Sequence, residues 1–273
     1  MIGFFYNDRV DRARPLAQEI ASWLTERDVA SWQAPRSAPP SGPQLANSDL
    51  LLTLGGDGTI LHAIALATPL GIPVLGVNLG LVGFLTECEP DNWQETLTQI
   101  LAGRGRVEER LMLHVALVQA GNVISQTVAL NDAVLSRGAL ARTVRLRAAI
   151  DGAQLAEYVA DGVIIATATG STAYSYAVGG PVLSPWSKSI LLVPVAPHLC
   201  LDRPLVLDCE AEIEITVHTR TPGMLTVDGH LVGQLGDGDG VQITRSALPA
   251  KFLRLRSRED FYRTLVARLM PRN

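Results

Sequence analysis

One stretch organises the chain: Leu50-Leu51-Leu52-Thr53-Leu54-Gly55-Gly56-Asp57-Gly58-Thr59-Ile60-Leu61-His62. Its apolar start, residues 50–54, predicts a buried parallel strand, and the glycines that follow lead into an alanine-rich helix that we expect to reach Ala67. A strand, a tight glycine turn and a helix N-terminus bind anions, because the unpaired N–H groups of the first helical turn and the helix dipole favour a phosphate there. We therefore predict a phosphate loop formed by Gly55, Gly56, Gly58 and Thr59.

Asp57 is unusual in a loop that binds anions. Its carboxylate would repel a phosphate unless a metal ion neutralises it, or unless it takes a proton from a reacting group. Both explanations indicate an enzyme. Asp-Gly is also the commonest tight-turn pair, and the chain has six of them. Only at Asp57 do two glycines precede the pair, with a buried strand before them and a helix after them.

Length and composition indicate a globular protein of two domains. The 273 residues are 47% hydrophobic and 18% charged, with a formal net charge of −4. This charge argues against a nucleic-acid or membrane partner. Cys88, Cys200 and Cys209 are far apart, as expected in a reducing compartment. The N-terminus lacks a signal-peptide pattern, and prolines and charges interrupt the apolar stretch 189–207, so we expect a cytoplasmic protein.

Strands and helices alternate over roughly the first hundred residues. We expect strands at 2–6, 29–33, 50–54 and 73–78, helices at 12–26, 57–67 and 91–101, and a proline-rich surface loop at 34–47. The alternation predicts a doubly wound α/β domain with a parallel sheet. Ligands of such sheets lie beyond the carboxyl ends of the strands, where Asp57 and Asn78 fall.

The sequence pattern changes near Glu108, where β-branched runs separated by turn pairs begin. Strands are expected at 111–118, 123–135, 143–150, 163–168, 190–195, 211–217, 224–227, 241–244 and 252–256. This half is predicted to be antiparallel β in two packed sheets, with one helix after Gly170. A helix at 258–269 closes the chain. The predicted domains are residues 1–107 joined by the C-terminal helix 258–273, and residues 108–257.

A second stretch, residues 161–180, places hydroxyl groups and small side chains between a strand and a helix. Its centre reads Thr169-Gly170-Ser171-Thr172-Ala173-Tyr174-Ser175. Hydroxyl and backbone donors suit the phosphates or ribose of a nucleotide, and small side chains let a flat ring approach. A helix capped by serine or threonine after a strand is an equally good interpretation.

Other features are weaker. Asn131-Asp132 ends a β run and by itself is more typical of a turn cap than of a site. The five histidines are scattered, and there is no Walker lysine motif, no Gly-x-Ser-x-Gly elbow and no histidine pair at zinc spacing. The sequence therefore gives no support to a covalent hydrolase or a zinc enzyme.

Together, these motifs resemble those of NAD kinases, in order along almost the whole chain. The matching residues are 55–59, 76–78, 83–86, 131–132, 161–162, 169–175, 179–181, 203–206 and 227–229. The Gly-Gly-Asp-Gly-Thr motif is shared with diacylglycerol and sphingosine kinases and, loosely, with phosphofructokinases. The Thr-Gly-Ser-Thr-Ala-Tyr motif is the specific one.

The resemblance implies a fold and a reaction. It implies an α/β domain for the phosphoryl donor, a β-sandwich-like domain for NAD, and a last helix that returns to the first domain. The γ-phosphoryl of ATP, or of inorganic polyphosphate in some members, would be transferred to the adenosine ribose 2′-hydroxyl of NAD. Asp57 would be the general base, a role that typically contributes about 10²–10⁴ in rate. A divalent ion, expected to be Mg²⁺, would bind the phosphates, and the protein would be a homodimer or homotetramer.

The resemblance also assigns contacts to NAD. Asn131 and Asp132 would hold the adenosine end, Phe84 would help close the adenine pocket, and Asp161 would face the nicotinamide side. The remaining expected contacts are Asp57, Gly58, His62, Arg142, Thr169, Thr172, Ala173, Tyr174, Ser175, Tyr176, Ala177 and His230.

Some residues depart from the family pattern. Asp132 stands where glutamate is more usual, and Val159 where many members have arginine or lysine. Ala166 and Ala168 replace a common serine and proline. Two other hypotheses stay open: a lipid kinase of the diacylglycerol kinase-like superfamily, which rests on the first motif alone, and a non-catalytic NAD(P) sensor, which would need the same pocket.

Overall fold

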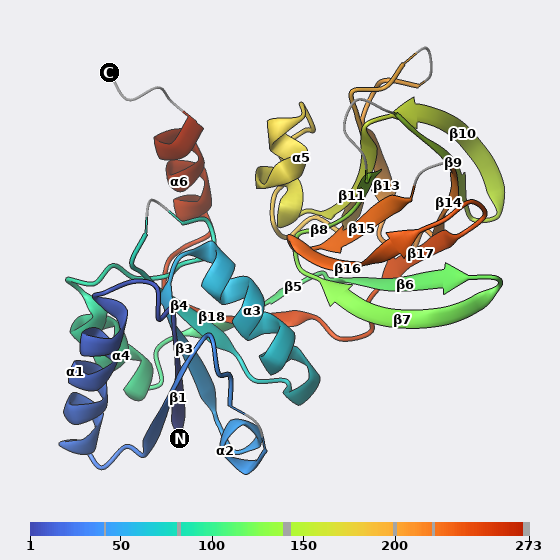
Figure 1. Cartoon of the computed structure of the whole chain (residues 1–273). Helices are drawn as coiled ribbons and strands as arrows, with labels where there is room; N and C mark the ends of the chain where they lie inside the picture. The colour runs from blue at the N-terminus through green and yellow to red at the C-terminus, as the bar shows by residue number, and fades with distance from the viewer. Residues whose placement is uncertain (41, 81–82, 139–142, 199–200, 220–221, 270–273) are drawn as a thin grey trace. The chain divides into compact units, whose positions relative to one another are not determined.

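Figure 1 presents the computed structural model of the chain, which describes residues 1–40, 42–80, 83–138, 143–198, 201–219 and 222–269. The chain divides into two compact units. The first comprises Met1–Glu109 and Ala250–Asn273, and the second comprises Arg110–Pro249. Within the described residues, no helix combines the length and apolar character needed to cross a membrane.

The first unit is built on a six-stranded sheet with the order β2-β1-β3-β4-β18-β5. The pairs of β1 with β2 and β3, of β3 with β4 and of β4 with β18 are all parallel. The predicted doubly wound α/β fold is therefore confirmed, and the strand order reverses at β1. The strands are β1 (Ile2–Tyr6), β2 (Ser31–Pro35), β3 (Leu50–Gly55), β4 (Val74–Asn78), β5 (Arg106–Arg110) and β18 (Ala250–Arg254).

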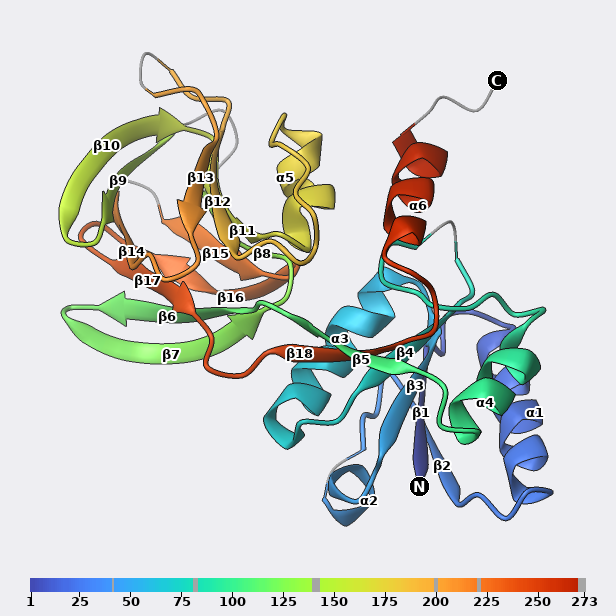
Figure 2. The same cartoon turned by 180° about the vertical axis from the view of Figure 1, so that it is seen from behind.

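Helices cover both faces of this sheet, as expected for buried parallel strands. In Figures 1 and 2, α1 (Ala13–Thr25) and α4 (Trp93–Leu101) lie against one face, and α3 (Asp57–Ala67) lies against the other. Leu50, Leu52 and Leu54 of β3 belong to the core shared with α1 and α4. The other helical segments are α2 (Pro43–Ala46), the 3₁₀ turn η1 (Thr68–Leu70) and α6 (Glu259–Leu269).

The second unit contains two six-stranded antiparallel sheets, β10-β9-β14-β17-β6-β7 and β13-β12-β11-β8-β15-β16. A core with side chains from both sheets, such as Leu146 and Ile165, fills the space between them. The prediction of two packed sheets is confirmed. The strands are β6 (Leu113–Gln119), β7 (Asn122–Ala129), β8 (Asp132–Arg137), β9 (Val144–Ile150), β10 (Ala153–Ala160), β11 (Gly162–Thr167), β12 (Ser189–Val195), β13 (Leu205–Asp208), β14 (Ile213–His218), β15 (Gly223–Val227), β16 (His230–Leu235) and β17 (Gly240–Arg245).

The second sheet has an apolar outer face as well. Ile164 and Ala166 of β11 and Leu191 and Val193 of β12 form a separate buried cluster, against which Val178 and Leu183 pack. The segment that follows β11 therefore lies over its own sheet. This segment begins with the 3₁₀ turn η2 (Gly170–Thr172) and the single-turn helix α5 (Tyr174–Ala177), which together are shorter than the predicted helix.

Several predicted elements need correction. The run 123–135 forms two strands, β7 and β8, in different sheets, and β5, β10, β13 and β16 were not predicted. The predicted loop 34–47 contains α2. The strand predicted at 252–256 is β18, which pairs with β4 of the first unit and not with the β-rich half to which we assigned it. Apolar alternation identifies a strand, but it does not identify the neighbours of that strand.

Candidate functional site

The phosphate loop lies where β3 ends and α3 begins, beside the reversal of strand order at β1. Gly55 is sterically required there, because a Cβ on it would lie 2.3 Å from Thr59 Oγ1. Asn7, which follows β1, is also close, at 3.3 Å from the same point. Ligands of doubly wound sheets bind at this kind of position.

The turn is open at Gly56 and Gly58. A Cβ on Gly56 would have no neighbour within 4 Å, and one on Gly58 would meet only the Arg36 guanidinium, at 4.0 Å. The described fold therefore does not explain these glycines by close packing, whereas approach of a ligand to the backbone would. Thr59 Oγ1 is buried and makes no hydrogen bond within the described part of the chain.

Asp57 is the first residue of α3, and its carboxylate is held in a defined orientation. Its Oδ2 accepts a hydrogen bond from the Phe84 N–H at 3.0 Å, and its Oδ1 accepts one from the Leu85 N–H at 3.1 Å. Gly83 lets this loop come close, because a Cβ there would lie 2.7 Å from Asp57 Oδ1. The half-buried Asp57 carboxylate is thus oriented by two backbone donors.

His62 and Phe84 are partly buried in the same unit. The His62 ring packs edge-on against Phe5, with 5.4 Å between the centroids. The Phe84 ring lies 6.4 Å from that of Phe261 in α6, so the closing helix packs against the loop that binds Asp57. The expected return of the last helix to the first unit is thus confirmed.

In the second unit, Asp228 organises the segment that contains Asn131 and Asp132. The Asp228 carboxylate accepts hydrogen bonds from the N–H groups of Leu130 at 2.8 Å, Asn131 at 2.8 Å and Asp132 at 3.1 Å. The Asp228 N–H in turn donates to the Asp132 carbonyl at 2.9 Å. Asp228 has a positive φ of 47°, which a turn Asp-Gly tolerates. The Asp-Gly pair at 228 therefore fixes Asn131-Asp132 in place.

The Asp132 side chain is buried, and this changes its acidity. Burial raises the pKa of Asp132 to about 7, and the nearby Asp228 carboxylate contributes in the same direction. Burial also raises the pKa of Asp228, against the opposing effect of its three N–H donors and of His230. Near neutral pH, Asp132 can therefore both donate and accept hydrogen bonds.

The segment after β11 contacts the Asn131 segment directly. The Thr167 hydroxyl donates to the Leu130 carbonyl, and the Gly170 N–H donates to the Thr167 hydroxyl at 3.0 Å. A Cβ on Gly170 would lie 2.1 Å from the Asn131 carbonyl oxygen. Ser171 links the segment to the chain beyond α5, since its hydroxyl donates to the Ala168 carbonyl at 2.7 Å and accepts from the Leu183 N–H at 3.0 Å.

The predicted dinucleotide contacts differ in exposure. Tyr174 and Tyr176 are 46% and 41% exposed although they are large apolar side chains, and Ala177 is also exposed. Thr172 and Ala173 are half-buried. Ser175 is buried, and its Oγ has no hydrogen-bond partner among the described residues. The segment therefore exposes two tyrosines and buries a serine hydroxyl without a partner among the described residues.

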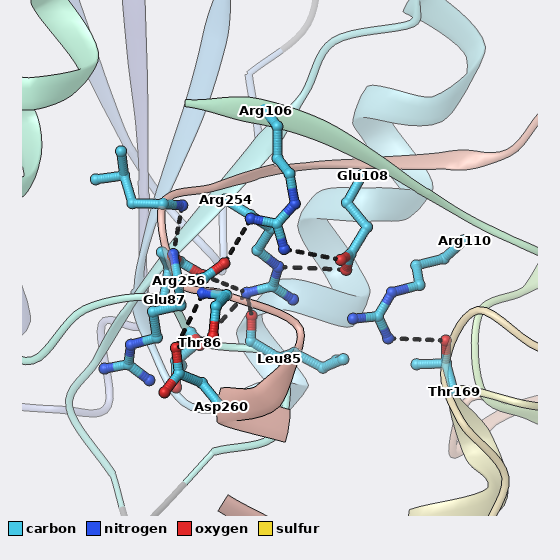
Figure 3. Close-up of polar contacts among 12 residues, drawn as sticks. Leu85, Thr86, Glu87, Arg106, Glu108, Arg110, Thr169, Arg254, Arg256 and Asp260 are labelled. Carbon is cyan, nitrogen blue, oxygen red and sulfur yellow. Dashed lines mark hydrogen bonds and ion pairs between the residues drawn. The ribbon is translucent and has the colours of Figure 1, made fainter. Parts of the chain in front are cut away.

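The remaining predicted residues lie at the edges of this segment or outside the description. Thr169 is buried, and its hydroxyl accepts a hydrogen bond from Arg110 at 3.4 Å (Figure 3). Asp161 forms an ion pair with Arg137, with 3.0 Å between Oδ1 and Nε. His230 is exposed at the start of β16. Arg142 lies outside the described residues.

The described residues contain no group of three or more His, Cys, Asp or Glu side chains that could hold a metal ion.

Sequence reasoning missed a buried ionic cluster in the first unit. Arg254 of β18 pairs with Glu87 and Glu108, and all three side chains are almost fully buried. A charged residue within an apolar strand, as in Phe252-Leu253-Arg254, was the only signal for it in the sequence.

Family comparison agrees with both motifs. Residues 43–105 match the family model of the ATP-NAD kinase N-terminal domain, and residues 130–255 match that of the ATP-NAD kinase C-terminal domain. The chain belongs to the ATP-NAD kinase family. The resemblance inferred from the sequence is thus confirmed.

Individual ATP-NAD kinase relatives match over nearly the whole chain. The NAD kinase of Chloroflexus aurantiacus is 41% identical over 269 residues, which cover 98% of each chain. Among solved structures, yeast NADH kinase complexed with NADH has a TM-score of 0.87 at 28% identity, covering 98% of this chain and 87% of the other. An NAD kinase from Archaeoglobus fulgidus in complex with ATP has a TM-score of 0.78 at 25% identity, covering 97% and 98%.

Proposed function

We propose that this protein transfers the γ-phosphoryl group of ATP to the 2′-hydroxyl of the adenosine ribose of NAD, giving NADP. Family membership supports the reaction, and relatives of similar fold are described in complex with ATP and with NADH. The observation that carries the catalytic assignment is the Asp57 carboxylate, which two backbone N–H groups orient beside an open glycine turn.

Asp57 acts as the general base in this proposal. The O–H bond of the ribose 2′-hydroxyl breaks, and its proton passes to the Asp57 carboxylate. The oxygen forms a bond to the γ-phosphorus, the bond from that phosphorus to the β,γ-bridging oxygen breaks, and ADP leaves. A divalent ion bound to the donor would neutralise part of the phosphate charge. The Asp57 contribution depends on geometry, because a general base must reach the proton that it accepts.

The donor phosphates would bind at the turn from Gly55 to Thr59. Open space at Gly56 and Gly58, the N-terminus of α3 and the Arg36 guanidinium next to Gly58 all favour an anion there. Inorganic polyphosphate would present the same chemistry as the triphosphate of ATP.

The NAD-binding residues would come from the second unit as well as from Asp57, Gly58, His62 and Phe84. In the second unit they are Asn131, Asp132, Arg142, Asp161, Thr169, Thr172, Ala173, Tyr174, Ser175, Tyr176, Ala177 and His230. The fixed backbone of residues 130–132 and the exposed rings of Tyr174 and Tyr176 support this assignment. Cysteine usage supports a cytoplasmic location. The family resemblance supports a homodimer or homotetramer.

The test is NADP formation by the purified protein with Mg²⁺, using NAD or NADH as acceptor and ATP or polyphosphate as donor in turn. We expect NADP from NAD and ATP. Saturable NADP binding without turnover under every donor and metal would establish a sensor instead. Phosphorylation of a lipid alcohol by a protein that ignores NAD would establish a lipid kinase.

Substituting Gly58→Ala separates the ligand role of the turn from its structural role. Gly58 lies in the first turn of α3 with no close neighbour, so alanine is expected to stabilise the helix by up to about 1 kcal/mol. The added methyl group would occupy space that the phosphates need, and misplacement by about 1 Å can cost roughly 100-fold in rate. We therefore expect unchanged or higher thermal stability with NADP formation lowered at least about tenfold. Wild-type activity in this variant would contradict ligand approach at Gly58.

Substituting Asp132→Asn tests the buried carboxyl group through pH. The pKa of Asp132 is about 7 in the folded protein against an ordinary value of 3.8, so the folded state holds a proton that the unfolded state releases, and stability falls as pH rises from about 4 to 7. The Asp132→Asn variant does not lose stability in this way as pH rises, because its side chain does not ionise. At pH 8 it should be more stable than the wild type by up to about 4 kcal/mol, since each tenfold change in proton affinity is worth about 1.4 kcal/mol.

Urea unfolding at pH 5 and pH 8 measures this difference. The advantage of Asp132→Asn should shrink at pH 5, while the exposed Asp202→Asn controls for removal of a carboxylate at the surface. An equal stability difference at both pH values would refute the raised pKa of Asp132.

A further inference from the structure

Arg254 makes several contacts with the segment that follows Gly83 (Figure 3). Its Nη1 donates hydrogen bonds to the Leu85 carbonyl at 2.8 Å, to the Glu87 carboxylate at 3.0 Å and, more weakly, to the Thr86 carbonyl at 3.4 Å. Its Nε lies 3.6 Å from Glu108 Oε1. Only 7% of the Arg254 side chain is exposed, against 2% for Glu87 and 5% for Glu108. The guanidinium is thus fixed on two sides by buried carboxylates.

Glu87 ties the same segment to β18 from the opposite direction. Its Oε1 accepts hydrogen bonds from the N–H groups of Leu255 at 2.7 Å and Arg256 at 2.6 Å. These hydrogen bonds therefore fix residues 85–87 and the end of β18 relative to each other.

Leu85 connects this cluster to Asp57. The Leu85 carbonyl accepts from Arg254, and the Leu85 N–H, on the other side of the same Cα, donates to Asp57 Oδ1 at 3.1 Å. The preceding N–H, that of Phe84, donates to Asp57 Oδ2. Two planar peptide units meet at the Leu85 Cα, so with the Leu85 carbonyl anchored by Arg254 only rotation about the two backbone bonds of Leu85 can redirect its N–H, and the Phe84 N–H follows one residue earlier.

We propose that Arg254 is a positioning residue for phosphoryl transfer: through the Leu85 carbonyl it fixes the two N–H groups that orient the Asp57 carboxylate. This inference rests on the proposed function. Stability alone gives a poor reason for the cluster, because well-packed apolar side chains often replace a buried ion pair at no cost. An arginine, in contrast, offers donors in a fixed plane that can reach a carbonyl and two carboxylates together.

The first test compares Arg254→Lys with the wild type. Lysine keeps the charge between Glu87 and Glu108, so the variant is expected to fold, but it loses the planar donor set. We expect kcat for NADP formation to fall at least about tenfold, with KM for NAD changed less than about threefold, since small misplacements of a catalytic group act mainly on the chemical step. The matched control is Ile20→Val or Ile20→Ala in the buried face of α1, whichever lowers the melting temperature equally. Its kcat should stay at the wild-type value.

The second test is a double-mutant cycle with Asp57→Asn. If Arg254 acts through Asp57, adding Arg254→Lys to Asp57→Asn should reduce kcat by less than about twofold further, because the group being positioned is already lost. Full additivity of the two effects, or a fall in kcat no larger than that of the Ile20 control, would overturn the proposal.

Amide hydrogen exchange gives a readout that needs no activity. Arg254→Lys should speed exchange of the Phe84 and Leu85 amides at least about tenfold, while the Ile20 control leaves them protected. A wild type that makes no NADP would refute the proposed function. Amide exchange would then still decide whether Arg254 fixes the N–H groups of Phe84 and Leu85. Unchanged exchange of both amides in Arg254→Lys would overturn the proposed link between Arg254 and these two N–H groups.

Discussion

Asp57→Asn should lower kcat for NADP formation by about 10²–10⁴, the usual contribution of a general base. Asparagine has nearly the same size as aspartate but cannot accept the hydroxyl proton at neutral pH. Its amide oxygen can still accept one of the two N–H groups of Phe84 and Leu85, while its NH₂ group would face the other. We therefore expect a stability loss of only about 1–3 kcal/mol, the cost of one unsatisfied donor, which leaves the protein folded at 25 °C.

Binding measurements separate catalysis from folding in this variant. Equilibrium binding of NAD, measured by calorimetry, should remain within a few-fold of the wild-type affinity. Turnover within about tenfold of the wild type would remove Asp57 from the general-base role. Loss of NAD binding together with activity would instead assign Asp57 a binding role only.

Gly170→Ala should affect both the stability of the second unit and its activity. The new methyl group would lie 2.1 Å from the Asn131 carbonyl oxygen and 2.6 Å from its carbon, and these are backbone atoms that cannot turn away. Overpacking of this kind typically costs about 1–3 kcal/mol. The required shift would also move Asn131 and Asp132 relative to the 169–175 segment. We expect a clear fall in melting temperature and a roughly ten- to hundredfold loss in kcat/KM for NAD.

Gly236→Ala is the matched control for this substitution. Gly236 lies in the turn after β16, and the nearest atom to its Cβ position is Asp239 Oδ2 at an ordinary 3.4 Å. This variant should retain both stability and activity. Wild-type behaviour of Gly170→Ala would mean that the 131 and 170 segments can separate without cost.

The sequence was most informative where a motif and an element coincide. The run from Leu50 to Thr59 predicted the strand, the turn and the helix. Its apolar residues indicate the buried strand β3, and its glycines indicate a tight turn between that strand and α3. The prediction that Asp57 belongs to an enzyme followed from its negative charge within a loop that binds anions. Likewise, alternating runs such as 143–150 identified strands of the sandwich to within a residue or two.

The pairing of strands could not be predicted, because local sequence patterns do not determine which strands are neighbours in a sheet. Nothing in Phe252-Leu253-Arg254 says that its strand pairs with β4, far away along the chain. The break at Leu130-Asn131 was hidden because the carboxylate of Asp228, far away along the chain, and not a neighbouring residue, satisfies those N–H groups. Strands such as β16, with an exposed face and an internal Gly233, lack the β-branched density that marks a strand in sequence.

The place of β18 in the first sheet has a consequence for synthesis on the ribosome. The second unit is one continuous segment and can complete its contacts as soon as residue 249 has emerged. The first unit was begun earlier, yet its sheet lacks the strand next to β4 until Ala250–Arg254 follows. Completion of the units therefore runs opposite to the common N-terminal-first order. Since Arg254 is the partner of the Leu85 carbonyl, a nascent or prematurely terminated chain would possess Asp57 without the arginine that we propose fixes its two N–H donors.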